Sequence, residues 1–236
     1  MKLHPSSDPA SANAVSYVRP VVRSFRLAFV KHAVTWVQGG GHAVVWASER
    51  KAFLVVPKPA TGNPSDYGRW AAYDLGRRRL RVASSGPFEG FGSVSLKGDD
   101  LPIVEAWSIR DGIHENPTRT MSLDCVACGA CCRNNTVILD AKDMARLRAG
   151  APQAFVDRVR RTDGHLVLTL LPNGDCAALT HAGTCGVYEA RPAACREFPA
   201  ASECCLFSRE EALNIVDGAA TGPSLFATSA FSTPGT

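Results

Sequence analysis

The chain has 236 residues, of which 45% are hydrophobic and 20% are charged, and its formal net charge at pH 7 is +4. This balance is typical of a globular protein and excludes a disordered, highly charged chain. The net charge is too small to indicate nucleic-acid binding by itself, because binding driven by phosphate needs a clustered basic face. All nine cysteines lie between Cys125 and Cys205, so the composition divides the chain into a cysteine-free half and a cysteine-rich half.

Residues 1–17 are polar and interrupted by proline and serine, which indicates a flexible leader rather than a secretory signal. Basic residues break up the apolar stretch that follows, and the sequence contains no run of the roughly 20 apolar residues that a membrane span needs. We therefore expect a cytoplasmic protein with no membrane partner. In that reducing compartment, a cysteine cluster more often binds metal or catalyses a reaction than forms disulfides.

Residues 18–115 are predicted to form a small α+β unit of unknown role. The apolar residues over 18–37 have helical spacing, and the glycines that follow would end such a helix. The other elements expected here are a hairpin of 43–47 with 53–56, a second hairpin of 71–75 with 80–84, and a helix over 101–114 with Pro102 near its start.

The basic run from Arg77 to Arg81 has two interpretations: a patch that contacts phosphate, or the solvated face of a hairpin. No aromatic residue interleaves the run, so we favour the solvated face and expect no nucleic-acid partner. We likewise expect Glu105, Asp111 and Glu115 to be solvated. The histidines share no motif spacing and are expected to be ordinary surface or core residues.

The segment from Cys125 to Cys132, here called the cysteine octet, has the sequence CVACGACC. One C-x2-C step lets two sulfurs converge on an ion, and the repeated step adds a third. Bacterial ferredoxins hold three irons of a cubane with this spacing, and it equally supplies three corners of a tetrahedral zinc site. Because neighbouring side chains of an extended chain project to opposite sides, Cys131 and Cys132 are not expected to complete the same site. A further ligand must then come from elsewhere.

The rest of the cysteine-rich half supplies such ligands. Cys176 and Cys185 each follow a short turn, and an adjacent cysteine pair follows Glu203. Cys195 lies near Arg191 and Arg196, whose guanidinium groups would offset thiolate charge and lower thiol pKa values. A single buried cysteine is often only a small hydrophobe. Nine in one short window would be prone to oxidation in the absence of metal, so the set points to metal binding.

Three segments follow one another in the cysteine-rich half: the octet, Asp175-Cys176-x-x-Leu179, and the run from Cys185 to Phe198. Together and in this order they resemble the CxxCxxCC cysteine-cluster family. This is the YkgJ-like group described as chelating zinc or iron, and the resemblance covers about residues 120–210. The metal ligands that it implies are Cys125, Cys128, Cys131, Cys132, Cys176, Cys185, Cys195 and Cys205. The spacing of Cys205 and Arg209 matches the family's Cys-x-x-x-Arg pattern, which leaves Cys204 as an extra thiol.

Residues 116–217 are predicted to form a small α+β domain in which metal replaces part of the core, followed by a disordered tail over 218–236. Its expected elements are a strand over 137–139, a helix over 141–149 capped by Asp140 and ended by Gly150, a helix over 153–161 opened by Pro152, a strand over 166–171 and a helix over 210–216. Asp143 is expected to oppose the positive end of the helix that Asp140 caps.

The cofactor expected is an iron–sulfur cluster, of the 4Fe-4S type for instance, or zinc. We favour iron–sulfur, because four-cysteine zinc sites usually combine two separated C-x-x-C knuckles and no second knuckle lies near residues 176–205. Either two centres share the eight thiols, or one centre uses Cys125, Cys128 and one of the adjacent pair and is closed from the segment 185–195. Of the two, we favour the single centre.

The sequence favours a metal-binding protein whose centre is structural, transfers electrons or handles metal. The alternative is a metal-dependent enzyme that transfers groups to proteins, because flagellin lysine methylases carry a similar cysteine cluster. No G-x-G-x-x-G loop and no radical-SAM cysteine spacing is present, and whether the protein is an enzyme stays open.

Overall fold

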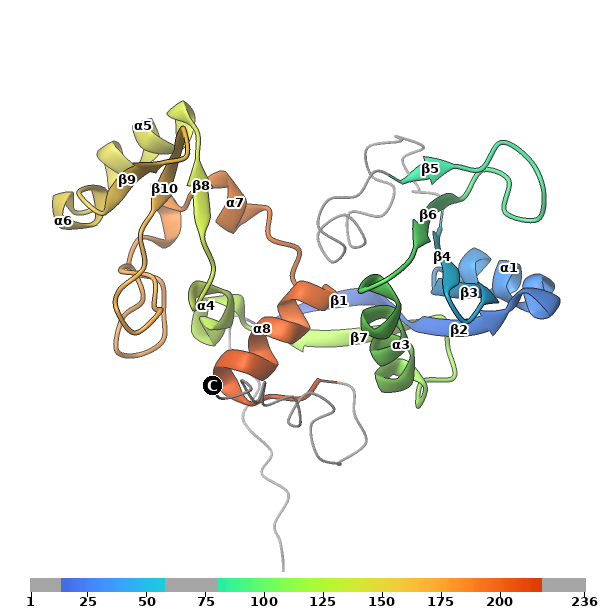
Figure 1. Ribbon diagram of the computed structural model, residues 1–236. Helices are drawn as coiled ribbons and strands as arrows, with labels where there is room; N and C mark the ends of the chain where they lie inside the picture. Colours follow the sequence, from blue (N-terminus) through green and yellow to red (C-terminus); the bar gives the residue numbers. More distant parts are fainter. Residues whose placement is uncertain (1–13, 58–79, 218–236) are drawn as a thin grey trace, which may run out of the picture.

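The computed structural model describes residues 14–57 and 80–217, which form an α+β protein of two lobes (Figure 1). The elements are β1 (Val15–Pro20), β2 (Val22–Arg26), η1 (Leu27–Phe29), α1 (Val30–Gln38), β3 (His42–Ser48), β4 (Lys51–Val56), β5 (Arg81–Val82), β6 (Gly92–Leu96), α3 (Asp100–Asp111), β7 (Thr118–Leu123), α4 (Cys125–Cys128), η3 (Ala130–Cys132), β8 (Val137–Leu139), α5 (Ala141–Gly150), α6 (Gln153–Val156), β9 (Val159–Thr162), β10 (His165–Leu168), η4 (Tyr188–Ala190), α7 (Ala193–Arg196) and α8 (Glu203–Leu213). Within these ranges, no helix combines the length and the apolar content that crossing a bilayer requires.

The first lobe is built on a five-stranded sheet in the order β2-β3-β4-β6-β5. Strand β2 runs parallel to β3, and the other neighbours are antiparallel. Successive side chains of a strand point to opposite faces, so β4 serves two cores. Leu54 packs in a cluster with Val104 of α3, whereas Val55 packs with Val37 of α1. The two helices thus cover opposite faces of the sheet.

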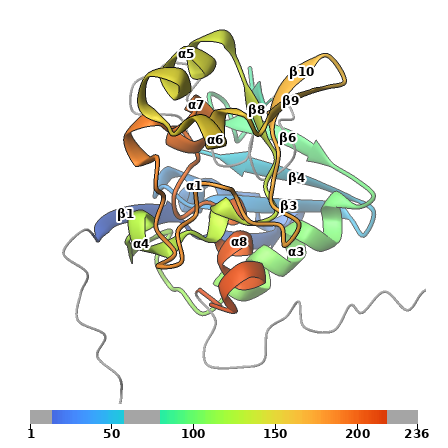
Figure 2. The same cartoon turned by 90° about the vertical axis from the view of Figure 1, so that its left-hand side faces the viewer.

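A two-stranded antiparallel ribbon of β1 and β7 connects the lobes. Its pairing runs from Val15 opposite Leu123 to Pro20 opposite Thr118. One face of the ribbon packs on α8, where Leu123 lies in a buried cluster with Leu206. Figure 1 shows the ribbon and α8 between the two lobes, and Figure 2 views the molecule from the side of the second lobe. Because β7 leads directly into the octet, the ribbon sets the position of the first cysteine.

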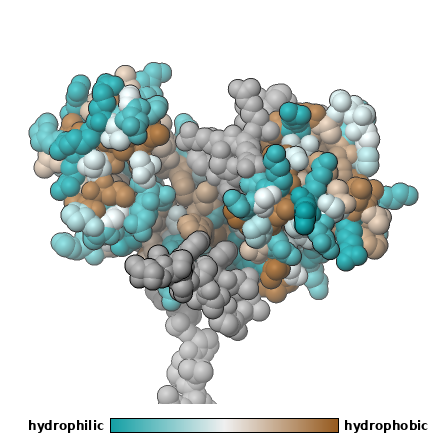
Figure 3. All heavy atoms as spheres, viewed as in Figure 1, coloured by the Kyte–Doolittle hydropathy of each residue, from teal (hydrophilic) through white to brown (hydrophobic). Residues whose placement is uncertain are grey.

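The second lobe contains the three-stranded sheet β8-β10-β9, which packs with α5 and α6 around one buried cluster. Asp140 accepts a hydrogen bond from the Asp143 amide at 2.7 Å, and the Asp143 carboxylate accepts one from the Asp140 amide at 3.2 Å. This reciprocal capping box confirms the predicted start of α5. The visible faces of both lobes mix hydrophilic and hydrophobic residues, in keeping with the balanced composition (Figure 3).

The helix predicted over residues 18–37 is wrong in its first half, where the chain forms β1 and β2. Val18 and Phe25 have helical spacing, but Val18 pairs with Thr120 of β7 and Phe25 with Val45 of β3. Pairing with distant strands overrides the local pattern here. Only α1, which begins at Val30, matches the prediction.

Two further helix boundaries differ from the prediction, one in the second lobe and one at α8. The helix predicted over 153–161 ends at Val156, because β9 follows and pairs with β10. The helix predicted over 210–216 begins earlier, at Glu203, since the Ser202 side chain caps it by accepting a hydrogen bond from the Cys205 amide at 3.2 Å.

The hairpin of β3 and β4, the helix α3 and the strand β8 confirm their predictions. The predicted strand over 166–171 is present only as far as Leu168. Residues 71–79 of the second predicted hairpin, with Arg77, Arg78 and Arg79, lie outside the described ranges, and Arg81 pairs with Ser93 of β6. The domain boundaries stay predictions; β1 begins at Val15, inside the predicted leader, and the predicted tail lies outside the described ranges.

Candidate metal centre

The octet folds as two short turns separated by a glycine. Asp124 caps the first turn, α4, by accepting hydrogen bonds from the amides of Val126 and Ala127 at 2.9 and 3.0 Å. Gly129 then has φ +60°, and a Cβ atom there would lie 2.5 Å from the carbonyl oxygen of Gly183. The glycine therefore lets the octet turn against the loop that connects Cys176 to Cys185.

Cys131 and Cys132 lie in the second turn, η3, and not in an extended segment. Adjacent side chains in a 3₁₀ turn are rotated by about 120°, since the helix has three residues per turn. The prediction of opposite projection is therefore wrong: the two side chains lie close enough for Cys131 to donate a hydrogen bond to Cys132.

All nine cysteines are reduced, and no disulfide joins them. Cys205 is buried, Cys125 and Cys131 are exposed, and the others are half-buried. Among the residues that the structure describes, no three His, Cys, Asp or Glu side chains are already arranged to hold a metal ion. The chemistry of the donors nevertheless fits, because soft thiolates are the ligands that zinc and iron–sulfur clusters prefer.

Three of the thiols gather beside α8 and are here called the first thiol group: Cys125, Cys128 and Cys205. Arg209 Nη1 donates a hydrogen bond to Cys128 Sγ at 3.2 Å. Arg209 lies four residues after Cys205 on α8, so the two share one face of the helix. Tyr17 Oη lies 3.9 Å from Cys125 Sγ, and Tyr17 packs against the cluster that contains Cys205.

Four other thiols, here called the second thiol group, lie toward the second lobe: Cys132, Cys176, Cys185 and Cys195. The Cys176 amide donates a hydrogen bond to the Cys132 carbonyl at 2.8 Å. Leu179 bridges to Cys185 as a strand pair and donates its amide to the Cys176 carbonyl, which brings the two ends of this loop together. Burial raises the pKa of Cys195 to about 12, and the charges of the other three thiols of the group add to this rise.

The pKa of Cys132 is shifted in the opposite direction from the pKa values of Cys125 and Cys205. Burial raises the pKa of Cys205 to about 11, and it also raises the pKa of Cys125. A hydrogen bond from Cys131 instead lowers the pKa of Cys132 to about 7, with Arg191 and Arg133 adding to the effect. Cys131 and the two arginines therefore favour the thiolate form of Cys132, which is the form that binds metal.

The two arginines predicted to support the cluster occupy different environments. Arg191 stacks on the Tyr188 ring, with its guanidinium carbon 3.4 Å from the ring centroid. Its charge helps to lower the pKa of Cys132, as described above. Arg196 instead donates hydrogen bonds to the carbonyls of Arg191, at 2.9 Å, and of Glu189. The structure thus places the charge of Arg191 near the thiols, whereas Arg196 binds backbone.

Cys204 lines a cavity of about 390 Å³ between α3 and α8, together with Trp107 and Phe207. Its neighbour Cys205 lies instead with the ribbon. This placement separates the extra thiol from the first thiol group.

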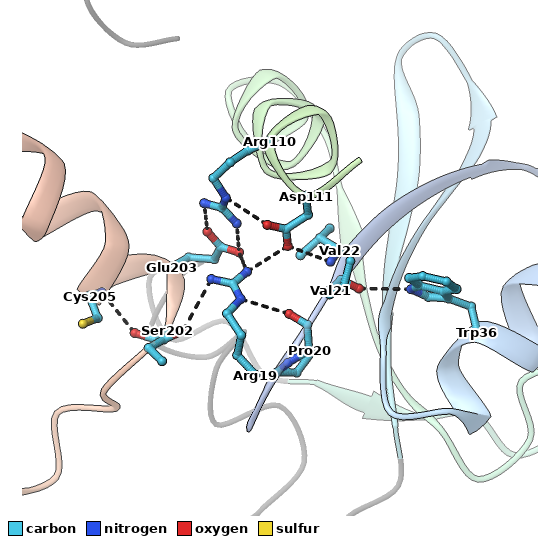
Figure 4. Close-up of polar contacts among 11 residues, drawn as sticks. Arg19, Pro20, Val21, Val22, Trp36, Arg110, Asp111, Ser202, Glu203 and Cys205 are labelled. Carbon is cyan, nitrogen blue, oxygen red and sulfur yellow. Dashed lines mark hydrogen bonds and ion pairs between the residues drawn. The ribbon is translucent and has the colours of Figure 1, made fainter. Parts of the chain in front are cut away.

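A buried set of charges, here called the junction cluster, holds the start of α8: Arg19, Arg110, Asp111 and Glu203 (Figure 4). Arg19 Nη2 lies 2.9 Å from Asp111 Oδ2 and 2.7 Å from Glu203 Oε1. Arg110 pairs with both carboxylates as well, and each of the four side chains is at most 8% exposed. Asp111 also accepts a hydrogen bond from the Val22 amide.

The junction cluster corrects one prediction and adds residues that the sequence analysis missed. Asp111 was expected to be solvated and is fully buried, whereas Glu105 and Glu115 are exposed as expected. Arg19 lies 92 residues from Asp111 and 184 from Glu203, so no local pattern reveals their contact. Because Glu203 lies two residues before Cys205, the cluster also fixes the position of a predicted ligand.

The histidines do not gather at the thiols as a ligand set within the described part of the chain. His42 is buried beside the junction cluster, and burial lowers its pKa to about 4. His32, His165 and His181 are exposed. These placements agree with the expectation of ordinary core and surface histidines.

The comparison with protein families identifies the cysteine-rich part of the chain. Residues 124–218 match the CxxCxxCC family model, described as "Putative zinc- or iron-chelating domain". No curated protein and no solved structure matches the chain. The matched range starts at Asp124, the cap of α4, and contains all nine cysteines, which confirms the resemblance and supports metal binding in general. Residues 124–218 are therefore the part of the chain that is similar to the CxxCxxCC family.

Proposed function

We propose that the protein binds an iron–sulfur cluster or zinc through the thiolates of its CxxCxxCC domain. The observation that carries this proposal is that thiols from three distant segments gather around the octet. The thiols come from α4 and η3, from the loop between Cys176 and Cys185, from α7 and from the start of α8. A chain without a ligand for them has little physical reason to hold so many free thiols together.

Charges beside the thiols support a thiolate-rich centre. Arg209 donates to Cys128, and Arg191 acts on Cys132. The bound metal would supply the positive charge that deprotonates the remaining thiols, whose pKa values burial now raises. Binding would then draw the sulfurs into metal coordination and release protons.

We favour an iron–sulfur cluster over zinc, because the C-x2-C-x2-C run matches the ferredoxin spacing and the chain has no second C-x-x-C knuckle. A reducing cytoplasm fits a domain whose cysteines are all free thiols. In this proposal the bound metal centre stabilises the domain. The centre also transfers electrons, or it handles metal if its ligands exchange.

Anaerobic purification followed by elemental analysis tests the proposal. We expect at least one equivalent of iron or zinc per chain. Brown protein with a broad absorption band in the blue would identify iron–sulfur, and colourless protein with stoichiometric zinc would identify zinc. Iron plus zinc well below one equivalent per chain would refute metal binding.

A further inference from the structure

The thiols of the family pattern separate into two sets on either side of the octet. The first thiol group faces the ribbon and α8: Arg209 touches Cys128 and shares a helix face with Cys205, while Tyr17 contacts Cys125. These contacts tie three sulfurs to one surface that lies next to the junction cluster.

The second thiol group faces the other way, toward the sheet of the second lobe. Cys176 and Cys185 both pack at the edge of the buried cluster that contains Leu168. The hydrogen bond between the backbones of Cys176 and Cys132 joins this loop to the end of the octet, and Arg133 pairs with Asp175 at 3.0 Å beside it. The Cys176 end of the loop is thereby fixed against Cys132.

Cys131 lies where the two sets meet. It follows Cys128 by three residues, as Cys128 follows Cys125, so the C-x2-C-x2-C run assigns it to the first thiol group. Cys132 breaks that spacing and is the residue that the second thiol group contacts. Each set then has four thiols, which is the number that one zinc ion or one cubane needs.

Arginines lie beside both sets. Arg209 donates a hydrogen bond to Cys128 of the first set, and the charge of Arg191 acts on Cys185 and Cys195 of the second set and on Cys125 of the first. A four-thiolate centre carries excess negative charge, which a nearby guanidinium partly offsets.

We propose that the domain holds two metal centres, one on Cys125, Cys128, Cys131 and Cys205 and one on Cys132, Cys176, Cys185 and Cys195. This inference rests on the proposed function and replaces the single centre favoured from the sequence. It gives the adjacent pair Cys131 and Cys132 a role, since each residue of the pair serves a different centre. Cys204, on the side of α3, belongs to neither.

The test uses the full chain, stripped of metal under anaerobic conditions and refilled with Zn²⁺. We expect two zinc ions per chain in the unsubstituted protein and in the control variant Cys204→Ser. Cys205→Ser and Cys176→Ser should each lose one zinc ion, and the double variant should lose both. A single zinc ion in the unsubstituted protein would overturn the two-centre arrangement, and so would the loss of both ions in either single variant. If the unsubstituted protein binds no zinc and holds no iron as purified, the proposed function itself fails.

A second measurement does not depend on how the variants fold. The unsubstituted protein is titrated with Zn²⁺ and alkylated, and its intact mass is recorded. Two centres should give molecules with four and then eight protected thiols, while Cys204 stays reactive. Protection that stops at four thiols at saturation, or that includes Cys204, would overturn the arrangement.

Discussion

Replacing Glu203 by Gln tests whether the junction cluster holds the lobes together. The substitution keeps the size of the side chain but removes the charge that faces Arg19 and Arg110, which are 2% and 8% exposed. Asp111 would then be the one carboxylate left in the cluster for both guanidinium groups. Breaking a buried ion pair by removing one partner costs about 3–5 kcal/mol, because the remaining charge stays buried without compensation. We expect the lower end, about 3 kcal/mol, since Asp111 still pairs with both arginines.

The assay is urea unfolding of the full chain, with Glu211→Gln as the matched control. Glu211 lies on the same helix and is exposed, so its substitution should change the free energy of unfolding by no more than about 0.5 kcal/mol. Glu203→Gln should also weaken zinc binding at Cys205 while leaving Cys176 protected from alkylation, because the cluster positions the start of α8. A Glu203→Gln variant as stable as Glu211→Gln would refute the reasoning.

Three other substitutions or conditions test single features of the fold. Since the pKa of His42 is lowered to about 4 from 6.5, the unfolded chain protonates first as the pH falls. The free energy of unfolding should therefore decrease from pH 6.5 to 4, by up to about 1.4 kcal/mol per pH unit. His42→Asn should flatten this slope in urea titrations, and an unchanged slope would contradict the role of His42. Asp140→Ala removes the capping box of α5 and should cost about 1 kcal/mol in the same assay, and a change within error would show that the cap does not contribute. Gly129→Ala combines a left-handed backbone, which costs about 1–2 kcal/mol outside glycine, with a Cβ atom 2.5 Å from a carbonyl oxygen. The Gly129→Ala variant should have a lower free energy of unfolding and less metal per chain. A normal metal content would contradict this account.

Features that depend on neighbouring residues could be predicted from the sequence. Asp140 and Asp143 define the start of α5 because a capping box is made within one turn. The C-x-x-C spacing of the octet likewise indicates a turn that presents thiols, whereas the second turn, at Cys131 and Cys132, was predicted to be extended. The match to the CxxCxxCC family rests on such local spacing, which is why it could be made without a structure.

Features that depend on distant partners could not be predicted from the sequence. Val18 and Phe25 have helical spacing, and only their pairing with β7 and β3 makes them strand residues. Asp111 has the sequence context of a solvated helix residue, and only the approach of Arg19 and Arg110 explains its burial.

The sequence alone determined that the second half of this protein is rich in cysteine and similar to a family of zinc- or iron-chelating domains, because the number and spacing of the thiols are local features of the chain. The tertiary structure decided which thiols lie together. It placed Cys205 beside Cys128 through α8 and Cys176 beside Cys132 through a backbone hydrogen bond. Segments separated by tens of residues come together only when the ribbon, the sheets and the junction cluster bury their side chains. That burial depends on the whole fold, and no short stretch of sequence encodes it.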